Sequence, residues 1–335
     1  MSETIIQLAH GGGGRLSRRL IAEEIVPRFG MESLRDLPDA AELKPEAKRL
    51  LFTTDSFVVQ PLEFPGGNIG DLAVHGTVND LAVCGGRPRW LSLSLILEEG
   101  LPLSRLRRVL DSAAAAAAQC GLQVVTGDTK VVARGQADGL YINSAGIGEM
   151  FPGFDLGPGR VRPGDSVLVS GPLGDHGLAV MAVREGIRIE GGPVSDTGPV
   201  HRLVQAIGEL APLVRFMRDP TRGGAAAVLN ELVEQRDVGV ELTEADIPVS
   251  PGTRAVAEML GLDVLQVASE GRLFLVCAPE AAEQIMARWH KLPEGGGAAC
   301  VGRISGEAGR VILVTVSGGR RLVDVPQGEL LPRIC

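Results

Sequence analysis

The sequence predicts an α/β (α+β) protein of two domains, each built around its own sheet. Three observations favour this fold class. The chain has 335 residues, about twice the usual length of one domain. Short apolar or alternating segments, typical of strands, recur between stretches with helical spacing. Residues 151–163 are rich in Gly and Pro and follow neither period, so we place the domain boundary there.

In the first half, helical and strand-like segments alternate. Residues 1–37 are predicted to form a Gly-rich loop and then a helix, because His10-Gly-Gly-Gly-Gly precedes apolar residues at helical spacing. Residues 38–150 are predicted to form the N-terminal domain. Ser104 is the expected N-cap of a helix that contains the alanine run at 113–118. The other expected elements are strands at 51–59, 91–95, 123–126 and 140–147 and a helix through 73–83.

The second half is predicted to form a C-terminal α/β domain over residues 160–325. Ser166 opens a short buried strand, and a Gly-rich loop after it leads into a helix near His176. Further helices are expected at 225–235, 254–260 and 281–289, and strands at 273–277 and 311–316. After Pro326 the sequence loses both periods. Residues 326–335 are therefore expected to form a mobile C-terminal tail.

The composition excludes several classes of function. Hydrophobic residues make up 44% of the chain and charged residues 22%, which excludes wholesale disorder. Aromatic residues make up 3% and the formal net charge is -8, so we expect no nucleic-acid partner. No apolar run reaches the ~18 residues of a membrane span, and the first residues lack the pattern of a signal peptide. We therefore expect a cytoplasmic protein with no membrane partner.

The Gly-rich N-terminal loop leaves two interpretations open. It is not a Walker A motif, because no Lys in this chain follows a Gly. It is not G-x-G-x-x-G either, because Leu16 stands where the last Gly should be. A flexible turn is one interpretation, and a cradle of backbone N–H groups for phosphate is the other.

Four aspartates are candidate ligands of a hard divalent ion. Their contexts are T-T-D-S at Asp55, V-N-D-L at Asp80, T-G-D-T-K at Asp128 and R-D-P-T-R-G-G at Asp219. Each is placed at an expected strand end or helix edge beside apolar sequence. Mg²⁺ prefers carboxylate oxygens together with phosphate oxygens of a substrate. Each aspartate equally fits an ordinary helix cap or Asx turn, so spacing alone does not decide.

Lys130 and Glu270 also lie beside apolar sequence. Lys130 is one of four lysines in a chain that otherwise uses Arg, and it follows an expected G-D-T turn. Glu270 lies in A-S-E-G-R between two apolar segments. A solvated lysine and a turn carboxylate are the plainer alternatives.

Cys335 is the last residue of the chain. Prenylation requires the Cys fourth from the end, so a lipid anchor does not fit. A thiol at the tip of a mobile tail is suited to carrying a covalent group between sites, and Arg333 is expected to counter the effect of the terminal carboxylate on the thiol pKa. A chance terminal cysteine is the alternative. The other four cysteines form no C-x-x-C pair and are expected to act as small hydrophobic residues.

Taken together, these segments resemble the HypE family of carbamoyl dehydratases of NiFe-hydrogenase maturation, within the aminoimidazole ribonucleotide synthetase-like superfamily. The resemblance covers essentially the whole chain. The segments that carry it are Q-L-A-H-G-G-G-G at 7–14, T-T-D-S at 53–56, F-P-G-G-N-I-G at 64–70, N-D at 79–80, I-L-E-E-G-L-P at 96–102, V-T-G-D-T-K-V-V at 125–132, S-G-P-L-G-D-H-G at 170–177, D-P-T-R-G-G at 219–224 and P-R-I-C at 332–335. The terminal P-R-I-C is the most specific of them. The family's S/N-E-G-K stands here as S-E-G-R at 269–272, which leaves Glu270 intact.

The resemblance implies a fold, a reaction and partners. The fold is a homodimer whose N-terminal domains pair into a β-barrel. The reaction is ATP- and Mg²⁺-dependent dehydration of a carbamoyl group on the terminal thiol, from thiocarbamate to thiocyanate, which supplies the cyanide ligand of the hydrogenase iron. The implied partners are the carbamoyltransferase HypF and the HypC–HypD scaffold complex.

The resemblance also implies site residues. It implies catalysis by Cys335, Lys130 and Glu270, ATP binding by Gly11, Gly12, Gly13, Asn68, Asp128 and Thr129, and metal binding by Asp55, Asp80, Asp128 and Asp219.

Two rival functions are weighed against it. A selenophosphate synthetase of the same superfamily would carry a reactive Cys or selenocysteine in the N-terminal Gly-rich region, and residues 10–15 contain none. An amidine-forming synthetase is a similar alternative. A non-enzymatic ATP-binding scaffold would bind ATP without turning it over.

Overall fold

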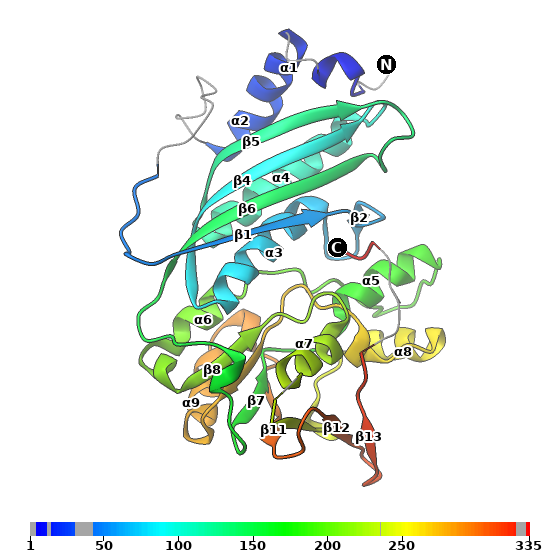
Figure 1. Ribbon diagram of the computed structural model, residues 1–335. Helices are drawn as coiled ribbons and strands as arrows, with labels where there is room; N and C mark the ends of the chain where they lie inside the picture. The colour runs from blue at the N-terminus through cyan, green and yellow to red at the C-terminus, as the bar shows by residue number, and fades with distance from the viewer. Residues whose placement is uncertain (1–4, 12–14, 31–42, 235, 326–332) are drawn as a thin grey trace.

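Two main sheets, one in each half of the chain, organise the protein (Figure 1). The structure is a computed structural model that describes residues 5–11, 15–30, 43–234, 236–325 and 333–335. The chain leaves the first sheet at Met150 and enters the second at Ser166. The predicted fold of two mixed α/β domains is therefore confirmed. In the described residues, no helix is long and apolar enough to cross a bilayer.

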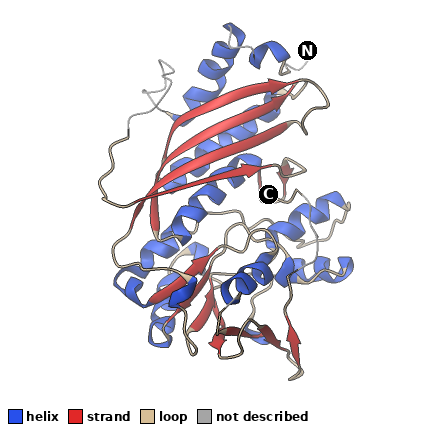
Figure 2. Ribbon diagram, viewed as in Figure 1, coloured by secondary structure: helices blue, strands red, loops and turns tan. Residues whose placement is uncertain are grey.

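The first sheet has the strand order β1-β6-β4-β5 within the described residues. Its strands are β1 (Leu50–Phe57), β4 (Gly86–Glu98), β5 (Gln123–Val132) and β6 (Leu140–Met150). β4 and β5 run parallel and the other neighbours antiparallel. Helices α3 (Ile69–Val83) and α4 (Leu103–Cys120) lie behind the sheet as viewed in Figure 2. The other face of the sheet, which we call the open face, is turned toward the viewer. A short ribbon, β2 (Glu63–Phe64) with β3 (Gly67–Asn68), leads into α3.

Two local expectations for this domain are wrong. Ser104 is not the N-cap of α4: the helix already begins at Leu103, with Pro102 in the cap position. The expected G-D-T turn is not a turn, because Gly127 to Lys130 continue strand β5. Pairing with β4 outweighs the local turn preference, and Gly127 fits because a Cβ there would lie 2.2 Å from the Leu93 carbonyl oxygen.

The N-terminal segment packs on the outside of α4. The helix expected after the Gly-rich loop is present as α1 (Arg15–Leu20), a π-helical turn at Ile21–Ile25 and α2 (Val26–Phe29). The Glu24 carboxylate accepts two hydrogen bonds from the Arg107 guanidinium of α4, at 2.7 and 2.9 Å. Gly12, Gly13 and Gly14 lie outside the described residues.

The second sheet has the order β13-β12-β9-β11-β7-β10-β8 in the described part of the chain. Its strands are β7 (Ser166–Val169), β8 (Val214–Arg218), β9 (Gly239–Thr243), β10 (Phe274–Cys277), β11 (Ala299–Ser305), β12 (Val311–Val314) and β13 (Arg320–Leu322). The helices of this half are α5 (Asp175–Arg184), α6 (His201–Ile207), α7 (Gly224–Val233), α8 (Pro251–Leu260) and α9 (Pro279–Trp289). Val167 and Val169 belong to one apolar core, and Leu168 between them belongs to another. Both faces of the sheet are buried at β7, β10 and β12, which explains why these three strands are nearly continuous apolar runs.

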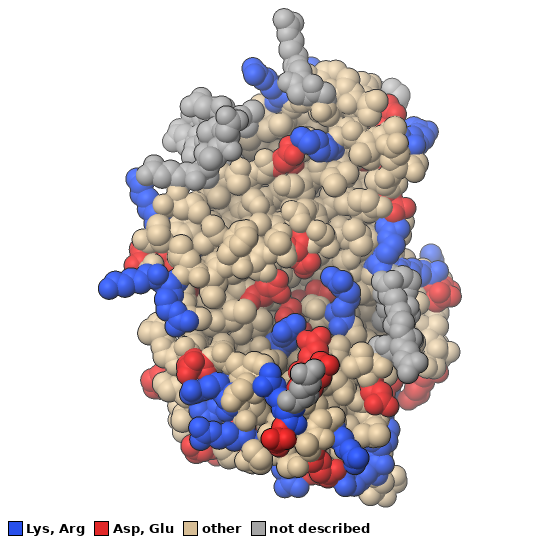
Figure 3. Space-filling model, viewed as in Figure 1, with Lys and Arg blue, Asp and Glu red and all other residues tan. Residues whose placement is uncertain are grey.

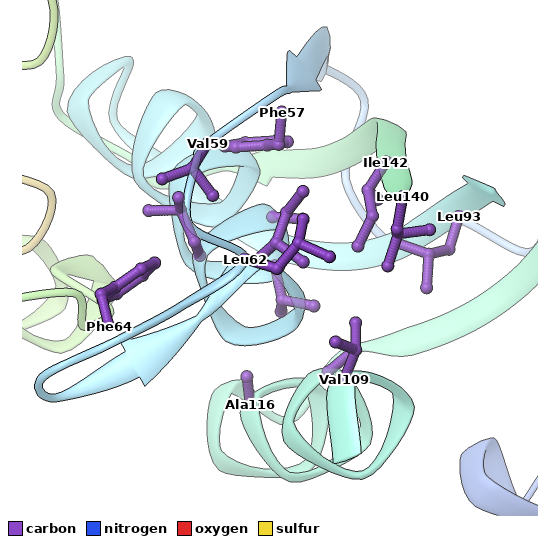
Figure 4. Packing of buried hydrophobic residues seen from close by; sticks show 14 of the residues in the cluster. Phe57, Val59, Leu62, Phe64, Leu93, Val109, Ala116, Leu140 and Ile142 are labelled. Atoms are coloured by element: carbon purple, nitrogen blue, oxygen red, sulfur yellow. The ribbon is translucent and has the colours of Figure 1, made fainter. Parts of the chain in front are cut away.

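A third apolar core joins the two halves. Phe57, Val59, Leu62 and Phe64 of the first half form part of it (Figure 4), and Leu178 of α5 belongs to the same cluster. The amide of Asn79 adds a polar connection. Its Nδ2 donates to the carbonyls of Gly198 and Glu270 at 3.0 and 2.9 Å, and its Oδ1 accepts from the Val200 N–H at 2.8 Å. The buried end of α3 is therefore fixed to two loops of the second domain.

Candidate active site

Asp55 and Asp80 meet where β1 packs on α3. Asp55 points to the helix side of the sheet, since its Oδ2 would lie 3.8 Å from a Cβ placed on Gly76 of α3. The Thr53 hydroxyl donates to Asp80 Oδ2 at 2.9 Å. Burial raises the pKa of both carboxyl groups, and the charge of Asp55 raises that of Asp80 further. Asp55 and Asp80 are thus two half-buried carboxylates beside the edge strand of the first sheet. The negative charge of one disfavours ionisation of the other.

Asp219 adds a third carboxylate from the other domain. It follows β8 directly, and burial, together with the charge of Asp80, raises its pKa to about 7. Asp80 and Asp219 both line a cleft of about 560 Å³ whose walls come from both domains and include Arg218 and Phe52. Figure 3 shows acidic side chains gathered where the two domains meet.

These three carboxylates suit a divalent cation that is completed by a substrate. No group of three His, Cys, Asp or Glu side chains in the described residues forms a ready-made metal site. Mg²⁺ typically takes one or two carboxylates and fills its remaining positions with water and phosphate oxygens. A cation would also offset the repulsion that Asp55 exerts on Asp80 and that Asp80 exerts on Asp219, which adds to the effect of burial on their pKa values.

Asp128 is separated from this group within one chain. One row of paired residues crosses the sheet from Asp128 on β5 to Ser56 on β1. The residues between them in this row are Ser94 on β4 and Asn143 on β6. Paired residues point to the same face and successive residues to opposite faces, so Asp128 and Asp55 point to opposite faces. Two strands also separate β5 from β1, a distance of roughly 14 Å at ~4.8 Å per strand.

Lys130 lies with Asp128 on the open face of the first sheet. Its Nζ is 3.0 Å from Asp128 Oδ2, and the hydrogen bond from Lys130 lowers the pKa of that carboxyl group. Gly11 packs on the same strand, since a Cβ on it would lie 2.6 Å from the Val131 nitrogen. Gly11, Asp128, Thr129 and Lys130 therefore form one group, which we call the β5 group.

Asn68 does not belong to the β5 group. Its Oδ1 accepts from the Gly70 N–H at 2.8 Å, and its backbone N–H donates to the Asp71 carboxylate at 2.7 Å, which is a capping box at the start of α3. Its Nδ2 donates to Ser112 Oγ of α4 at 2.6 Å. The described contacts of Asn68 are those of a helix cap.

Glu270 is buried and carries an unsatisfied oxygen. Its side chain is 2% exposed, and Oε1 has no hydrogen-bond partner among the described residues. Burial first, and then the charges of Asp219 and Asp196, raise the pKa of Glu270 well above its usual value. Its backbone is held by Asp196, whose Oδ1 accepts the Glu270 N–H at 3.2 Å. A carboxyl group whose pKa is raised in this way is a stronger base than an ordinary glutamate and is suited to accept a proton from a bound group.

The C-terminus lies beside this carboxyl group. The Val58 N–H donates to the Cys335 carbonyl at 3.1 Å, and the Gln60 N–H donates to the Arg333 carbonyl at 3.2 Å. Burial raises the pKa of the Cys335 thiol to about 12, with smaller contributions in the same direction from Glu270 and Asp55. The terminal thiol and Glu270 thus lie close enough for the charge of Glu270 to act on the thiol, although they come from separate segments of the C-terminal half.

Arg222, rather than Arg333, opposes the rise in the thiol pKa. A hydrogen bond and the positive charge of Arg222 lower the pKa of Cys335. Arg333 instead donates from Nε to the Val58 carbonyl and forms an ion pair with Asp138. The expectation for Arg333 is therefore wrong, and sequence reasoning missed Arg222. The signal that could have found it is a lone Arg between a candidate ligand and two glycines in D-P-T-R-G-G.

Cys84 also departs from expectation. It caps the C-terminus of α3, is exposed and lines the cleft beside Asp80. Cys120 and Cys277 are buried, as expected of small hydrophobic residues.

Comparison with known proteins assigns this chain to a family. Residues 38–150 match the family model of the AIR synthase related protein N-terminal domain, and residues 162–314 match that of the C-terminal domain. Carbamoyl dehydratase HypE of Rhizobium leguminosarum bv. viciae is 47% identical over 332 residues, which cover 98% of this chain and 95% of the relative. The chain belongs to the HypE family. Carbamoyl dehydratase HypE of Escherichia coli (strain K12) is 45% identical over 335 residues, covering 98% and 99% of the two chains.

Solved HypE structures share the whole fold. A HypE in complex with ATP superposes with a TM-score of 0.94 at 41% identity, covering 98% of this chain and 99% of the other. A chain of a HypE–HypF complex superposes with a TM-score of 0.81 at 38% identity, covering 93% and 100%. Thiamine-monophosphate kinase of Stenotrophomonas maltophilia K279a, 20% identical with a TM-score of 0.65, shares the fold alone. This chain is thus a HypE-family enzyme with the two-domain AIR synthase-related fold.

Proposed function

We propose that this HypE-family enzyme uses ATP to dehydrate a carbamoyl group carried on the Cys335 thiol, and so supplies the cyanide ligand of a NiFe-hydrogenase iron. The observation that carries the proposal is the position of the terminal thiol beside Glu270, a buried carboxyl group with an unpartnered oxygen. The names of its relatives and the ATP complex of a related HypE support the same reaction.

The reaction needs two steps, because the carbamoyl oxygen is a poor leaving group. In the first, the carbamoyl oxygen attacks the γ-phosphorus of ATP and ADP leaves, while one N–H proton is lost. In the second, the remaining N–H proton is lost as the C–O bond breaks, which gives phosphate and the S-bound nitrile. Glu270 would accept an N–H proton, and Arg222 and Lys130 would stabilise negative charge near the thiol and the oxygen.

Asp55, Asp80 and Asp219 would hold the Mg²⁺ that such a reaction uses. Bound there, the cation would neutralise charge on the transferring phosphoryl group. The raised pKa of Asp219, about 7, means that protons compete for this site, so we expect Mg²⁺ affinity to increase as the pH rises toward 7.

The test is the mass of the C-terminal peptide. Full-length protein carbamoylated on Cys335 should lose the mass of one water molecule from that peptide after ATP–Mg²⁺ is added, and should release one ADP per thiol. An unchanged peptide mass with ATP bound would favour the scaffold function. The same loss mapped to another cysteine would contradict the assignment of Cys335.

The Asp80→Ala variant should bind ATP–Mg²⁺ poorly and fail to turn over while remaining folded. Removal of Asp80 takes a ligand from the carboxylate group but leaves the apolar packing of α3 in place. Titration calorimetry with ATP at several Mg²⁺ concentrations measures the effect. Asp111→Ala, which removes an exposed carboxylate of α4 that pairs with Arg28, is the matched control. Full ATP-dependent dehydration by Asp80→Ala would contradict the metal assignment.

We also propose that the chain forms a homodimer through the open face of the first sheet. Exposed residues alternate along β1, and Leu50 and Phe52 on this face are 48% and 72% exposed. Figure 3 shows the upper part of this face with few charged side chains. An exposed apolar sheet face with free edges at β1 and β5 is typical of an interface. Closing two such sheets into a barrel would remove the free edges.

The Phe52→Lys variant should dissociate this dimer. A lysine at the centre of an apolar interface leaves a buried charge without a partner, which commonly destabilises association strongly. Light scattering after gel filtration measures the mass. Val316→Lys, which changes another highly exposed apolar residue but lies in the C-terminal domain, should leave the mass unchanged. A dimer that survives Phe52→Lys at low micromolar concentration would place the interface elsewhere.

The Lys130→Ala variant should accept the carbamoyl group but dehydrate it slowly. Loss of one charge-stabilising group typically costs about 10²–10³ in rate, whereas loading requires only an accessible thiol. Within one chain, Lys130 lies on the opposite sheet face from Asp55, so we propose that the β5 group of one copy serves the thiol of the other. Mixing Lys130→Ala chains with Cys335→Ser chains should then restore dehydration. Loss of carbamoyl acceptance with normal dehydration would reverse the role of Lys130.

The proposed partners follow from the same chemistry. The related HypE–HypF complex supports HypF as the enzyme that loads the thiol. We propose the HypC–HypD complex as the acceptor of the cyanide.

A further inference from the structure

The last three residues bind in a site formed by both domains. Their backbone lies antiparallel to residues 58–60, with the Val58 and Gln60 N–H groups donating to the carbonyls of Cys335 and Arg333. The Arg184 guanidinium of α5 donates to the same Arg333 carbonyl. In Figure 1 the C-terminus lies next to β2, between the first sheet and α5. The tail is therefore held by an edge of the N-terminal domain and by a helix of the C-terminal domain.

His176 supplies the central contact of this site. It lies in the first turn of α5 and is fully buried, with Phe64 against its ring at 5.1 Å between centroids. Its Nε2 lies 2.7 Å from the Ile334 carbonyl oxygen, and its Nδ1 lies 2.8 Å from Ser195 Oγ. A carbonyl oxygen only accepts, so Nε2 must carry the proton that is donated to the tail.

Ser195 is the partner of the other ring nitrogen. Burial lowers the pKa of His176, which favours the neutral ring, and with the proton on Nε2 the Nδ1 atom accepts from the Ser195 hydroxyl. The Ser195 Oγ in turn accepts from the Thr197 N–H at 3.1 Å. The Ile334 carbonyl and the Ser195 hydroxyl are thus compatible with the same ring tautomer, and neither the proposed metal group nor the proposed proton transfer uses His176.

The site also contacts the side chains of Ile334 and Arg333. Ile334 is 3% exposed and belongs to the same apolar cluster as Leu178 and Val180 of α5. Arg333 has a left-handed backbone with φ of 55°, a conformation that is unfavourable for a non-glycine residue. It is held there by its Nε bond to the Val58 carbonyl and by its ion pair with Asp138 at 2.5 Å.

We propose that His176, fixed by Ser195, is a positioning residue that docks the C-terminal tail and so sets where the Cys335 thiol lies. Its importance for catalysis rests on the proposed function, but the docking itself does not. His176 touches the tail backbone one residue before the thiol, so loss of its hydrogen bond frees the thiol without changing Glu270, Asp55 or Arg222.

The test measures how fast iodoacetamide alkylates Cys335 in the full-length protein, mapped by peptide mass spectrometry. Cys84, which is exposed and distant in sequence from the tail, is the internal reference in every sample. His176→Leu should raise the Cys335 rate by about threefold to tenfold, the range that one lost neutral hydrogen bond represents. His176→Gln, whose amide keeps a donor near the Nε2 position, should restore most of the protection. The Cys84 rate should not change.

Ile334→Ser tests the same docking without changing the folded body of the protein. It removes the buried side chain of the tail, so it should also raise the Cys335 rate, and it decides the matter if His176→Leu does not fold. Unchanged Cys335 rates in Ile334→Ser and in folded His176→Leu, or an equal increase in His176→Gln and His176→Leu, would overturn the proposal.

Measuring the rate of dehydration as well as of alkylation distinguishes a failure of this proposal from a failure of the proposed function on which it rests. Carbamoylated His176→Leu should lose water more slowly than the wild type at saturating ATP, with ATP affinity unchanged. A wild type that never loses water, combined with the expected alkylation rates, would reject the function and retain the docking. Normal water loss in both proteins with unchanged alkylation would retain the function and reject the docking.

Discussion

Cys335→Ser should abolish the dehydrated product and leave ATP binding intact. The proposed reaction requires the carbamoyl group to be bound to the sulfur of Cys335 as a thiocarbamate. A serine hydroxyl is far less nucleophilic than a cysteine thiol, so it should not be loaded with the group. The contacts that hold the tail are made by the backbone of residues 333–335 and by the side chains of Arg333 and Ile334. The serine variant should therefore still dock. The measurement is the ATP-dependent loss of water from the C-terminal peptide, with ATP affinity from calorimetry.

Cys84→Ser is the matched control for this variant. Cys84 is exposed in the cleft beside Asp80, so it is the cysteine best placed to replace Cys335 if the terminal thiol is not the carrier. Its serine variant should retain full activity. Product formed by Cys335→Ser would show that another thiol carries the group.

Glu270→Gln should slow dehydration by about 10²–10⁴, the usual effect of removing a positioned general acid–base group. Glutamine has the same shape and cannot take the proton, so the carbamoyl group should still be loaded while water loss nearly stops. Single-turnover kinetics of a carbamoylated sample give the rate. A rate within threefold of the wild type would exclude Glu270 from proton transfer.

The same variant should change how stability depends on pH. The folded pKa of Glu270 is raised well above its usual value, so between the unfolded and folded pKa values the folded state binds more protons than the unfolded state. Folding stability therefore falls as the pH rises above about 4.5. Glu270→Gln should remove this decline and melt at a higher temperature than the wild type at pH 8, but not at pH 4. If the folding stability of the two proteins depended on pH in the same way, the pKa of Glu270 would not be raised in the folded state.

The sequence predicted the central elements of the fold but missed those without a clear period. Strand β7 is an apolar run and was expected, whereas β8 (V-R-F-M-R) contains two arginines and was not. Its position at a sheet edge, paired only with β10 among the described strands, allows the polar residues. Helix α6 is short, and its boundary depends on contacts with α3 and α9 rather than on local sequence.

The sequence names candidate site residues one by one but does not give their arrangement. Asp55, Asp80 and Asp219 lie close enough to influence one another's pKa values, yet Asp128, with a similar sequence context, points to the opposite face of the sheet from Asp55. That difference depends on strand order, which spacing along the chain does not contain. The role of Asn79 could not be predicted from the sequence for the same reason. Its neighbour Asp80 lines the cleft, whereas the Asn79 amide makes hydrogen bonds to the second domain.

Under the proposed function, the docking site of the C-terminus would compete with a loading partner for residues 333–335. A loading enzyme that needs the Cys335 thiol can bind only the fraction of molecules whose tail has left the site of His176 and Arg184. If one molecule in a hundred is undocked, the apparent dissociation constant of that partner is about a hundredfold weaker than its intrinsic value. Under the proposed function, each hydrogen bond to residues 333–335 would weaken the apparent affinity of the loading partner while it holds the thiol in place for dehydration. The best tail is one of intermediate affinity, and variants that dock too tightly should limit turnover at the loading step.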